Sequence, residues 1–264
     1  MKILKFFILF FFFISCNKGG FLTSVNSPDN KILLDFKIVD GRLLYSINKE
    51  DKAVISESSL GLILKNDIDL KNGFKIKNQK QTSFNDNWNP LFGEYKTIKN
   101  NYNQLTLELN NNKTEINIEF RIYNDGVAFR YILPKQKSIQ NYDLMDEITE
   151  FNLSSKDSAW WIPGFSYRRY EFLYANTGID DISKKVYSDL VEEISYDSLG
   201  IDAAHTPLTI KKNNGILISI HEANLVDYSS MTLSPKGKGS LEVELYPWSD
   251  GIKVKSDNGI KSSW

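Results

Sequence analysis

Glu222 is the side chain in this sequence best placed to do chemistry, because it directly follows an apolar strand pattern. Asn213-Asn214-Gly215 separates two alternating apolar runs, 207–210 and 216–220. An Asn-Gly pair supplies the positive φ angles of a tight turn, so the segment predicts a β-hairpin. Because side chains alternate between the faces of a strand, Glu222 shares a face with the isoleucines of the second run, and His221 lies on the other face.

An ionised carboxylate on such an apolar face is costly unless it is ion-paired, hydrogen-bonded or bound to a metal. We therefore expect Glu222 to leave the sheet where the strand ends and to face a cleft or a second domain. The residues leave two roles open for it. Glu222 is either a rim glutamate in a salt bridge with a nearby lysine or arginine, or a group that binds a ligand.

Acid–base chemistry on a sugar is a further alternative. His205 or His221 together with Glu222 could supply the general acid and general base of a mutarotase-like aldose epimerase. Adjacent residues of a regular strand point to opposite faces, which argues against His221 and Glu222 acting on one substrate. The His221-Glu222 pair lacks the second histidine of a zinc-binding helix, and the sequence has no Gly-rich phosphate loop and no serine nucleophile elbow.

A second group of candidate residues lies in the aromatic segment 160–174, which reads WWIPGFSYRRYEFLY. Aromatic rings contact the flat C–H faces of sugars, and charged side chains bind sugar hydroxyls, so this segment predicts a carbohydrate platform. The alternative is that the rings pack beneath the loop or against a neighbouring domain. With His221, the candidate substrate-facing residues are Trp160, Trp161, Tyr167, Arg168, Tyr170 and Glu171.

The elements that must position these residues are short strands. Apolar or alternating runs recur along the chain and are separated by polar turns, which predicts an all-β antiparallel sandwich or barrel. An ordered loop is expected over 85–101, a turn at Ser58-Ser59 and one short helix over 184–193. The expected strands cover 31–36, 42–48, 53–56, 60–64, 74–81, 105–110, 114–123, 127–133 and 241–245.

The N-terminus indicates export. Residues 1–15 combine Lys2 and Lys5 with an apolar run and a small residue before Cys16, which resembles a bacterial lipoprotein signal peptide. We expect Cys16 to be lipidated, residues 16–30 to form a tether, and the folded domain to span 31–264. The protein would then be a periplasmic or outer-membrane lipoprotein attached to the membrane through Cys16. The alternative is an ordinary secretory signal with an incidental cysteine.

Composition limits the possible partners. The 264 residues are 41% hydrophobic and 25% charged, which is ordinary for a globular protein with a sizeable core. Lysine and arginine number 32 against 33 aspartate and glutamate, for a net charge of −1. The chain has no basic excess to neutralise phosphates, so we expect no nucleic-acid partner.

Several motifs together resemble the N-terminal domain of glycoside hydrolase family 97, the α-glucosidases and α-galactosidases of Bacteroidetes. Six ordered motifs at compatible spacing carry the resemblance, which covers nearly all of the chain after Cys16. They are residues 30–45, Ser59-Leu60-Gly61-Leu62, the segment 88–94 with 101–103, residues 120–131, Trp161-Ile162-Pro163, and the segment 206–209 with 220–223 and 226–228.

The resemblance implies a large β-sandwich of the galactose-mutarotase-like type, placed before a (β/α)8 barrel that carries the catalytic carboxylates. It also implies that Glu222 reaches into the active site as a calcium ligand. Calcium takes about six to eight oxygen ligands, so the barrel must supply the others. No barrel follows Trp264 in these residues, and we expect the sandwich to be truncated at its C-terminal end.

The expected function is therefore that of a carbohydrate-binding module that completes the active site of a calcium-dependent α-glycosidase acting on an oligosaccharide or α-glycoside. Glycoside hydrolysis needs two positioned carboxyl groups. The resemblance places both in the barrel, so no catalytic residue is expected in this chain, and the chain by itself is expected to be inactive. The alternative is a lipid-anchored glycan-binding protein without catalysis.

Overall fold

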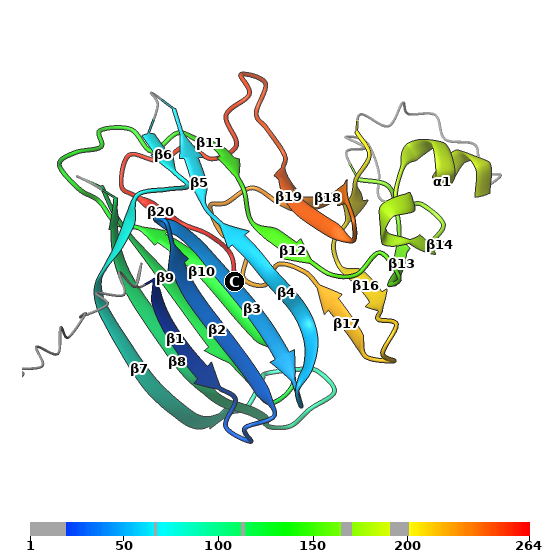
Figure 1. Cartoon of the computed structure of the whole chain (residues 1–264), viewed down its shortest axis with the longest axis horizontal. Helices are drawn as coiled ribbons and strands as arrows, with labels where there is room; N and C mark the ends of the chain where they lie inside the picture. The colour runs from blue at the N-terminus through cyan, green and yellow to red at the C-terminus, as the bar shows by residue number, and fades with distance from the viewer. Residues whose placement is uncertain (1–19, 66–67, 112–113, 165–170, 191–200) are drawn as a thin grey trace, which may run out of the picture.

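The structure, a computed structural model, describes residues 20–65, 68–111, 114–164, 171–190 and 201–264. Two antiparallel sheets, one of eight strands and one of five, pack against each other with their apolar faces inward (Figure 1). Side chains from both sheets form one core cluster. The predicted all-β sandwich is confirmed, and the smaller elements lie at the ends of the two sheets.

The eight-stranded sheet is built on strict alternation. In β2 the side chains of Ile32, Leu34, Phe36 and Ile38 are buried while those between them are half-buried. This period-two pattern gives each strand one face for the core. In spatial order the strands are β1 (Phe21–Asn26), β2 (Ile32–Val39), β3 (Arg42–Lys49), β4 (Lys52–Leu60), β12 (Glu150–Asn152), β19 (Ser240–Leu245), β18 (Met231–Gly237) and β15 (Ala204–His205).

The five-stranded sheet covers the core from the other side. Its contact with the large sheet is aromatic, because the Phe36 and Phe120 ring centroids lie 6.0 Å apart and those of Tyr45 and Phe129 lie 5.5 Å apart. Such tilted ring pairs stabilise a core beyond the area they bury. In spatial order the strands are β20 (Ile260–Lys261), β10 (Val127–Leu133), β9 (Thr114–Ile122), β8 (Ile98–Asn111) and β7 (Phe74–Trp88).

Two smaller sheets complete the fold. The three-stranded sheet contains β11 (Leu144–Glu147), β5 (Leu62–Leu64) and β6 (Ile68–Leu70). The four-stranded sheet contains β14 (Ala175–Gly178), β13 (Ser158–Trp161), β16 (Leu208–Lys211) and β17 (Leu217–Ile220). The 3-10 helix η1 (Ile179–Asp181) and the helix α1 (Lys184–Leu190) lie beside this sheet (Figure 1). Within the described ranges, no helix is long and apolar enough to cross a membrane.

Several predicted boundaries are wrong. The tether expected over 16–30 is wrong for Phe21–Asn26, which forms β1 and pairs with β2 along its whole length. The turn expected at Ser58-Ser59 is wrong, because both residues lie inside β4, which is separated from β5 only at Gly61. The loop expected over 85–101 is shorter, since β7 and β8 continue into it. The short helix is confirmed over Lys184–Leu190, and the rest of its expected range lies outside the described residues.

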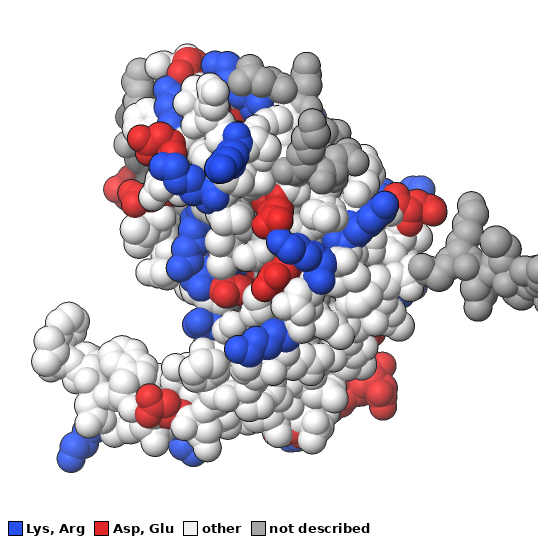
Figure 2. Space-filling view, turned by 90° about the vertical axis from the view of Figure 1, so that its left-hand side faces the viewer, with Lys and Arg blue, Asp and Glu red and all other residues white. Residues whose placement is uncertain are grey.

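Surface charge follows the balanced composition. Figure 2 shows lysine and arginine interspersed with aspartate and glutamate on one face, without a continuous field of either sign. Several lysines of the described residues form exposed ion pairs with carboxylates, such as Lys77 with Glu115 at 2.6 Å. Exposed pairs of this kind contribute little to stability, about 0–1 kcal/mol each. The core and the buried polar groups therefore decide the stability of the fold.

Candidate functional site

The hairpin predicted to carry Glu222 is formed by β16 and β17, which pair antiparallel with Ile210 opposite Ile218. Its turn is wider than the sequence predicts. The Gly215 N–H donates to the carbonyl of Lys212 at 2.9 Å, and Gly215, with φ of +87°, is the one residue of Asn213–Gly215 with a positive φ. The turn therefore needs a glycine only at its last position, and the asparagines keep ordinary backbone angles.

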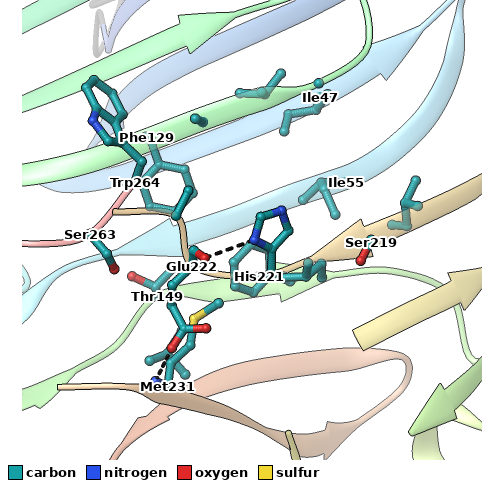
Figure 3. Close-up of a pocket in the computed structure, with 18 of the residues that line it drawn as sticks. Ile47, Ile55, Phe129, Thr149, Ser219, His221, Glu222, Met231, Ser263 and Trp264 are labelled. Atoms are coloured by element: carbon teal, nitrogen blue, oxygen red, sulfur yellow. Dashed lines mark hydrogen bonds between the residues drawn. The ribbon is translucent and has the colours of Figure 1, made fainter. Parts of the chain in front are cut away.

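Glu222 lies two residues beyond the end of β17 and is half-buried. Its carboxylate accepts a hydrogen bond from the hydroxyl of Thr206. The backbone N–H of Met231 donates another, at 2.7 Å (Figure 3). No lysine or arginine of the described chain forms an ion pair with Glu222. Hydrogen bonds, not the salt bridge that the sequence left open, hold this carboxylate in place.

Glu222 lines a cavity of about 490 Å³ that lies among β17, the large sheet and β10. Most of the lining is apolar, with Glu222 and His221 on one side (Figure 3). A cavity with an apolar lining and a few convergent polar groups is typical of a ligand or partner site. The lining also includes Glu147, Tyr228 and Trp264.

A second carboxylate, Glu147, lines the same cavity, and the sequence analysis missed it. Its side chain accepts hydrogen bonds from the hydroxyls of Thr149, at 2.7 Å, and Tyr228. The Thr149 oxygen in turn lies 2.8 Å from the Tyr131 hydroxyl. Burial raises the pKa of Glu147, the two hydrogen bonds partly offset this rise, and the charge of Glu222 adds to it. Tyr228 belongs to a motif that carried the family resemblance, and that motif was the available signal.

Replacing Glu147 by glutamine is expected to flatten the dependence of stability on pH. Because the pKa of Glu147 is raised, the folded protein binds this proton more tightly than the unfolded chain. The resulting stability is present at low pH and is lost as pH rises from the ordinary pKa of glutamate through the raised one. Urea unfolding across this range should show a smaller loss of stability in Glu147→Gln than in the wild type.

The exposed Glu94, replaced by glutamine, provides the control and should keep the wild-type slope. Asp146 and Glu242 also have raised pKa values, so the difference between the two variants is the informative quantity. Equal slopes in Glu147→Gln and the wild type would contradict the prediction.

The two histidines occupy different environments. His205 is 4% exposed, its ring stacks on Tyr246, and burial lowers the pKa of its imidazole. It is not among the residues that line the cavity. His221 is exposed, and its Nδ1 lies 2.9 Å from the backbone oxygen of Glu222. Since β17 ends at Ile220, strand alternation no longer separates His221 from Glu222, and both line the cavity.

The two tryptophans of the predicted carbohydrate platform lie on opposite faces of strand β13. Trp160 is 37% exposed on the outward face, whereas Trp161 is 1% exposed and belongs to the core. The Trp161 indole N–H donates to the Thr177 hydroxyl at 3.0 Å, and its ring packs on Tyr187. The prediction that Trp161 faces a substrate is therefore wrong, because adjacent strand residues point to opposite sides.

The other platform residues are placed less fully. Glu171 is exposed, whereas Tyr167, Arg168 and Tyr170 lie outside the described residues, as does Cys16. Neither Trp160 nor Glu171 lines the cavity beside Glu222. The structure therefore brings His221 and Glu222 together at the cavity and leaves Trp160 on a separate surface.

The donor atoms at the cavity fit calcium only in part. A carboxylate oxygen is a suitable calcium ligand, and each Glu222 oxygen that accepts a hydrogen bond keeps a second lone pair. Within the described ranges, however, no cluster of three or more histidine, cysteine, aspartate or glutamate side chains could hold a metal ion. Glu222 can contribute one ligand, and the remaining ligands must come from outside these residues.

The fold and the cavity define a class: a β-sandwich module whose carboxylate lies at a strand end beside an apolar cavity. The family "Glycosyl-hydrolase 97 N-terminal" matches residues 25–264. The chain belongs to this family of glycoside hydrolase domains. The family resemblance read from the sequence motifs is thereby confirmed.

Individual relatives are longer than this chain. A retaining alpha-galactosidase of Bacteroides thetaiotaomicron is 24% identical over 213 residues, which are 79% of this chain and 30% of the relative. A glycoside hydrolase family 97 enzyme from Pseudoalteromonas sp. strain K8, solved in complex with acarbose, superimposes with a TM-score of 0.81 and 33% identity, covering 92% of this chain and 34% of that one. A beta-arabinopyranosidase shares the fold, with a TM-score of 0.76, 20% identity, and coverage of 92% of this chain and 39% of its own. The chain thus spans about a third of the length of these proteins.

Proposed function

We propose that the chain is the N-terminal module of a calcium-dependent α-glycosidase, either an α-glucosidase or an α-galactosidase, and that it binds carbohydrate and completes the active site. The observation that carries this proposal is the half-buried carboxylate of Glu222 beside an open cavity in a domain of this family. The names of the relatives support the substrate class. One relative is a retaining alpha-galactosidase, and enzymes from the Pseudoalteromonas strain were solved with acarbose and with panose.

Glu222 would act as one calcium ligand in this module, and a catalytic barrel, in the same chain or encoded separately, would supply the others. A single carboxylate cannot surround an ion that takes about six to eight oxygens. We therefore expect the 264 residues alone to bind calcium weakly, with a Kd on the order of 1 mM or higher. Titration calorimetry with calcium chloride, on the wild type and Glu222→Gln, measures this affinity.

The same carboxylate provides the sharpest test. Any weak heat of calcium binding in the wild type should disappear in Glu222→Gln and persist in Glu94→Gln, which removes an exposed carboxylate of the β7–β8 loop that does not line the cavity. Tight calcium binding that survives Glu222→Gln would show that the ligand role has been assigned to the wrong residue.

Catalysis is expected to be absent from these residues by themselves. Hydrolysis of a glycosidic bond needs an acid and a base or nucleophile placed on either side of it. The buried Glu147 and the hydrogen-bonded Glu222 serve structural and ligand roles in our proposal. Hydrolysis of nitrophenyl α-glucoside or nitrophenyl α-galactoside by the purified chain, above the rate of a heat-denatured sample, would contradict this.

A second candidate function is favoured by the exposed ring of Trp160. In this alternative the chain is a lipid-anchored protein that binds glycans without catalysis and is held at the periplasmic face of a membrane through Cys16. Titration with panose should then show an affinity that Trp160→Ala abolishes and Glu222→Gln leaves unchanged. Growth with labelled palmitate tests the anchor, because a Cys16→Ser variant should lose a label that the wild type carries.

A further inference from the structure

Trp264 lies against two arginine side chains of the five-stranded sheet. Its indole ring has the guanidinium carbon of Arg121 at 4.0 Å and that of Arg130 at 3.9 Å from its centroid. Cations at this distance from an indole face are attracted by the ring quadrupole, and tryptophan is the best aromatic partner for them. The two arginines and the indole form a clamp, which we call the Trp264 clamp.

The arginines of the Trp264 clamp are held by their own strands. Arg130 of β10 forms an ion pair with Glu119 of β9 at 2.6 Å, and both side chains are largely buried, at 11% and 16% exposure. Arg121 of β9 donates from Nε to Gln104 of β8 at 3.0 Å and lies over the ring of Tyr102. Because these partners belong to adjacent strands of one sheet, they present the guanidinium groups in a fixed geometry.

The backbone of Trp264 connects this sheet to the Glu222 segment. The Trp264 N–H donates to the carbonyl of Ala223 at 2.9 Å, and the Ala223 N–H donates back to the carbonyl of Trp264 at 3.0 Å. Ala223 directly follows Glu222 and is exposed. β17 is the edge strand of its sheet, and its residues line the cavity. The reciprocal pair therefore joins the segment after β17 to the segment that follows β20 of the five-stranded sheet.

We propose that Trp264 is a positioning residue for Glu222. The Trp264 clamp holds the indole on the five-stranded sheet, and the backbone of Trp264 holds Ala223, the residue after Glu222. The ligand role of Glu222 rests on the proposed function. The positioning itself rests only on these contacts. Trp264 touches no ligand in this proposal, and it fixes the segment that turns the Glu222 carboxylate toward Met231 and the cavity.

Amide hydrogen exchange in the intact chain tests the positioning directly. The Ala223 amide reports the pairing with Trp264, and the Met231 amide reports the carboxylate of Glu222, to which it donates. In Trp264→Ala we expect both amides to exchange about tenfold faster. Opening of this segment no longer has to break the two cation–π contacts, so the free energy of local opening is lower. The Leu34 amide in the large sheet should keep its rate.

Two further variants separate positioning from general destabilisation. Trp264→Phe keeps an aromatic ring against the arginines and should restore most of the protection. Trp248→Ala removes another tryptophan of the C-terminal region, one that is 64% exposed, and should leave the Ala223 and Met231 amides unchanged. Unchanged exchange at these two amides in Trp264→Ala, or an equal acceleration at Leu34, would overturn the proposal.

The calcium titration distinguishes this proposal from the proposed function. If Glu222 binds calcium, Trp264→Ala should weaken the affinity and Trp264→Phe should recover it. If the wild type shows no calcium binding at any concentration while the exchange pattern appears as expected, the ligand role fails and the positioning role stands.

Discussion

Replacing Asp157 by alanine is expected to lower the free energy of unfolding by about 3–5 kcal/mol, because the change leaves a buried ammonium without its partner. Asp157 is 1% exposed, and its carboxylate lies 2.9 Å from the Nζ of Lys212, which is 5% exposed. The same carboxylate accepts hydrogen bonds from the backbone N–H groups of Ser154, at 3.0 Å, and Asn213, at 2.8 Å. These contacts fix the start of the β16–β17 turn on the sandwich.

Urea unfolding of matched variants measures this effect. Glu115→Ala breaks the exposed pair with Lys77 and should cost about 0–1 kcal/mol, since solvent screens such pairs. The double variant Asp157→Leu with Lys212→Met removes both buried charges and should recover much of the loss. A cost for Asp157→Ala no larger than that of Glu115→Ala would show that solvent reaches Lys212.

Truncation of the two neighbouring tryptophans should lower the stability by very different amounts. Trp161→Ala is expected to cost about 3–5 kcal/mol, because it opens a large cavity and leaves the Thr177 hydroxyl without the indole donor. Trp160→Ala removes a ring from the outward face of the same strand and should cost about 1 kcal/mol or less. The midpoint and slope of urea unfolding give both values.

Glycan titration of the same two variants separates packing from binding. If the outward face of β13 is a carbohydrate surface, Trp160→Ala should lose affinity for panose while it stays folded. Trp161→Phe retains an aromatic core residue and should recover most of the stability that Trp161→Ala loses. A Trp161→Ala protein as stable as Trp160→Ala would contradict the burial of Trp161.

Gly41 is required by a close contact between two backbone segments. Gly41, with φ of +77°, would place an added Cβ 2.6 Å from the backbone nitrogen of Gly73. The close passage of these two backbones joins the β2–β3 turn to the start of β7. Since backbone atoms cannot yield as a side chain does, any residue other than glycine at position 41 must displace the chain.

The fold was largely predictable from the sequence because strand patterning is local. The alternation predicted over 114–123 appears as β9 (Thr114–Ile122), with its isoleucines and Phe120 fully buried, and the run 127–133 is β10 at its predicted bounds. The register of the β16–β17 hairpin was less predictable, because the turn before residue 216 is wider than the tight Asn-Gly turn that the sequence predicts. The tether predicted at 21–26 and the turn predicted at Ser58-Ser59 are wrong for one reason. Polar residues also occur within strands when one face of the strand packs on the core or its edge pairs with another strand.

The site was predictable only in part. The position of Glu222 at a strand end followed from period-two alternation, and a family resemblance supplied its ligand role. The partners that hold it, Thr206 and Met231, and the neighbouring Glu147 come from other strands. Contacts between strands that are distant in the chain leave no periodic signal, so the sequence could not identify these partners.

By itself, then, the sequence determined the sandwich, the hairpin and the carboxylate at its end, since each depends on the spacing of a few neighbouring residues. Only the tertiary structure decided which tryptophan is core, which carboxylate is buried and where Trp264 lies. Those outcomes depend on which surfaces the packing of two sheets covers. Packing acts between strands that are far apart in the chain, and for that reason Trp160 is exposed and Trp161 is buried.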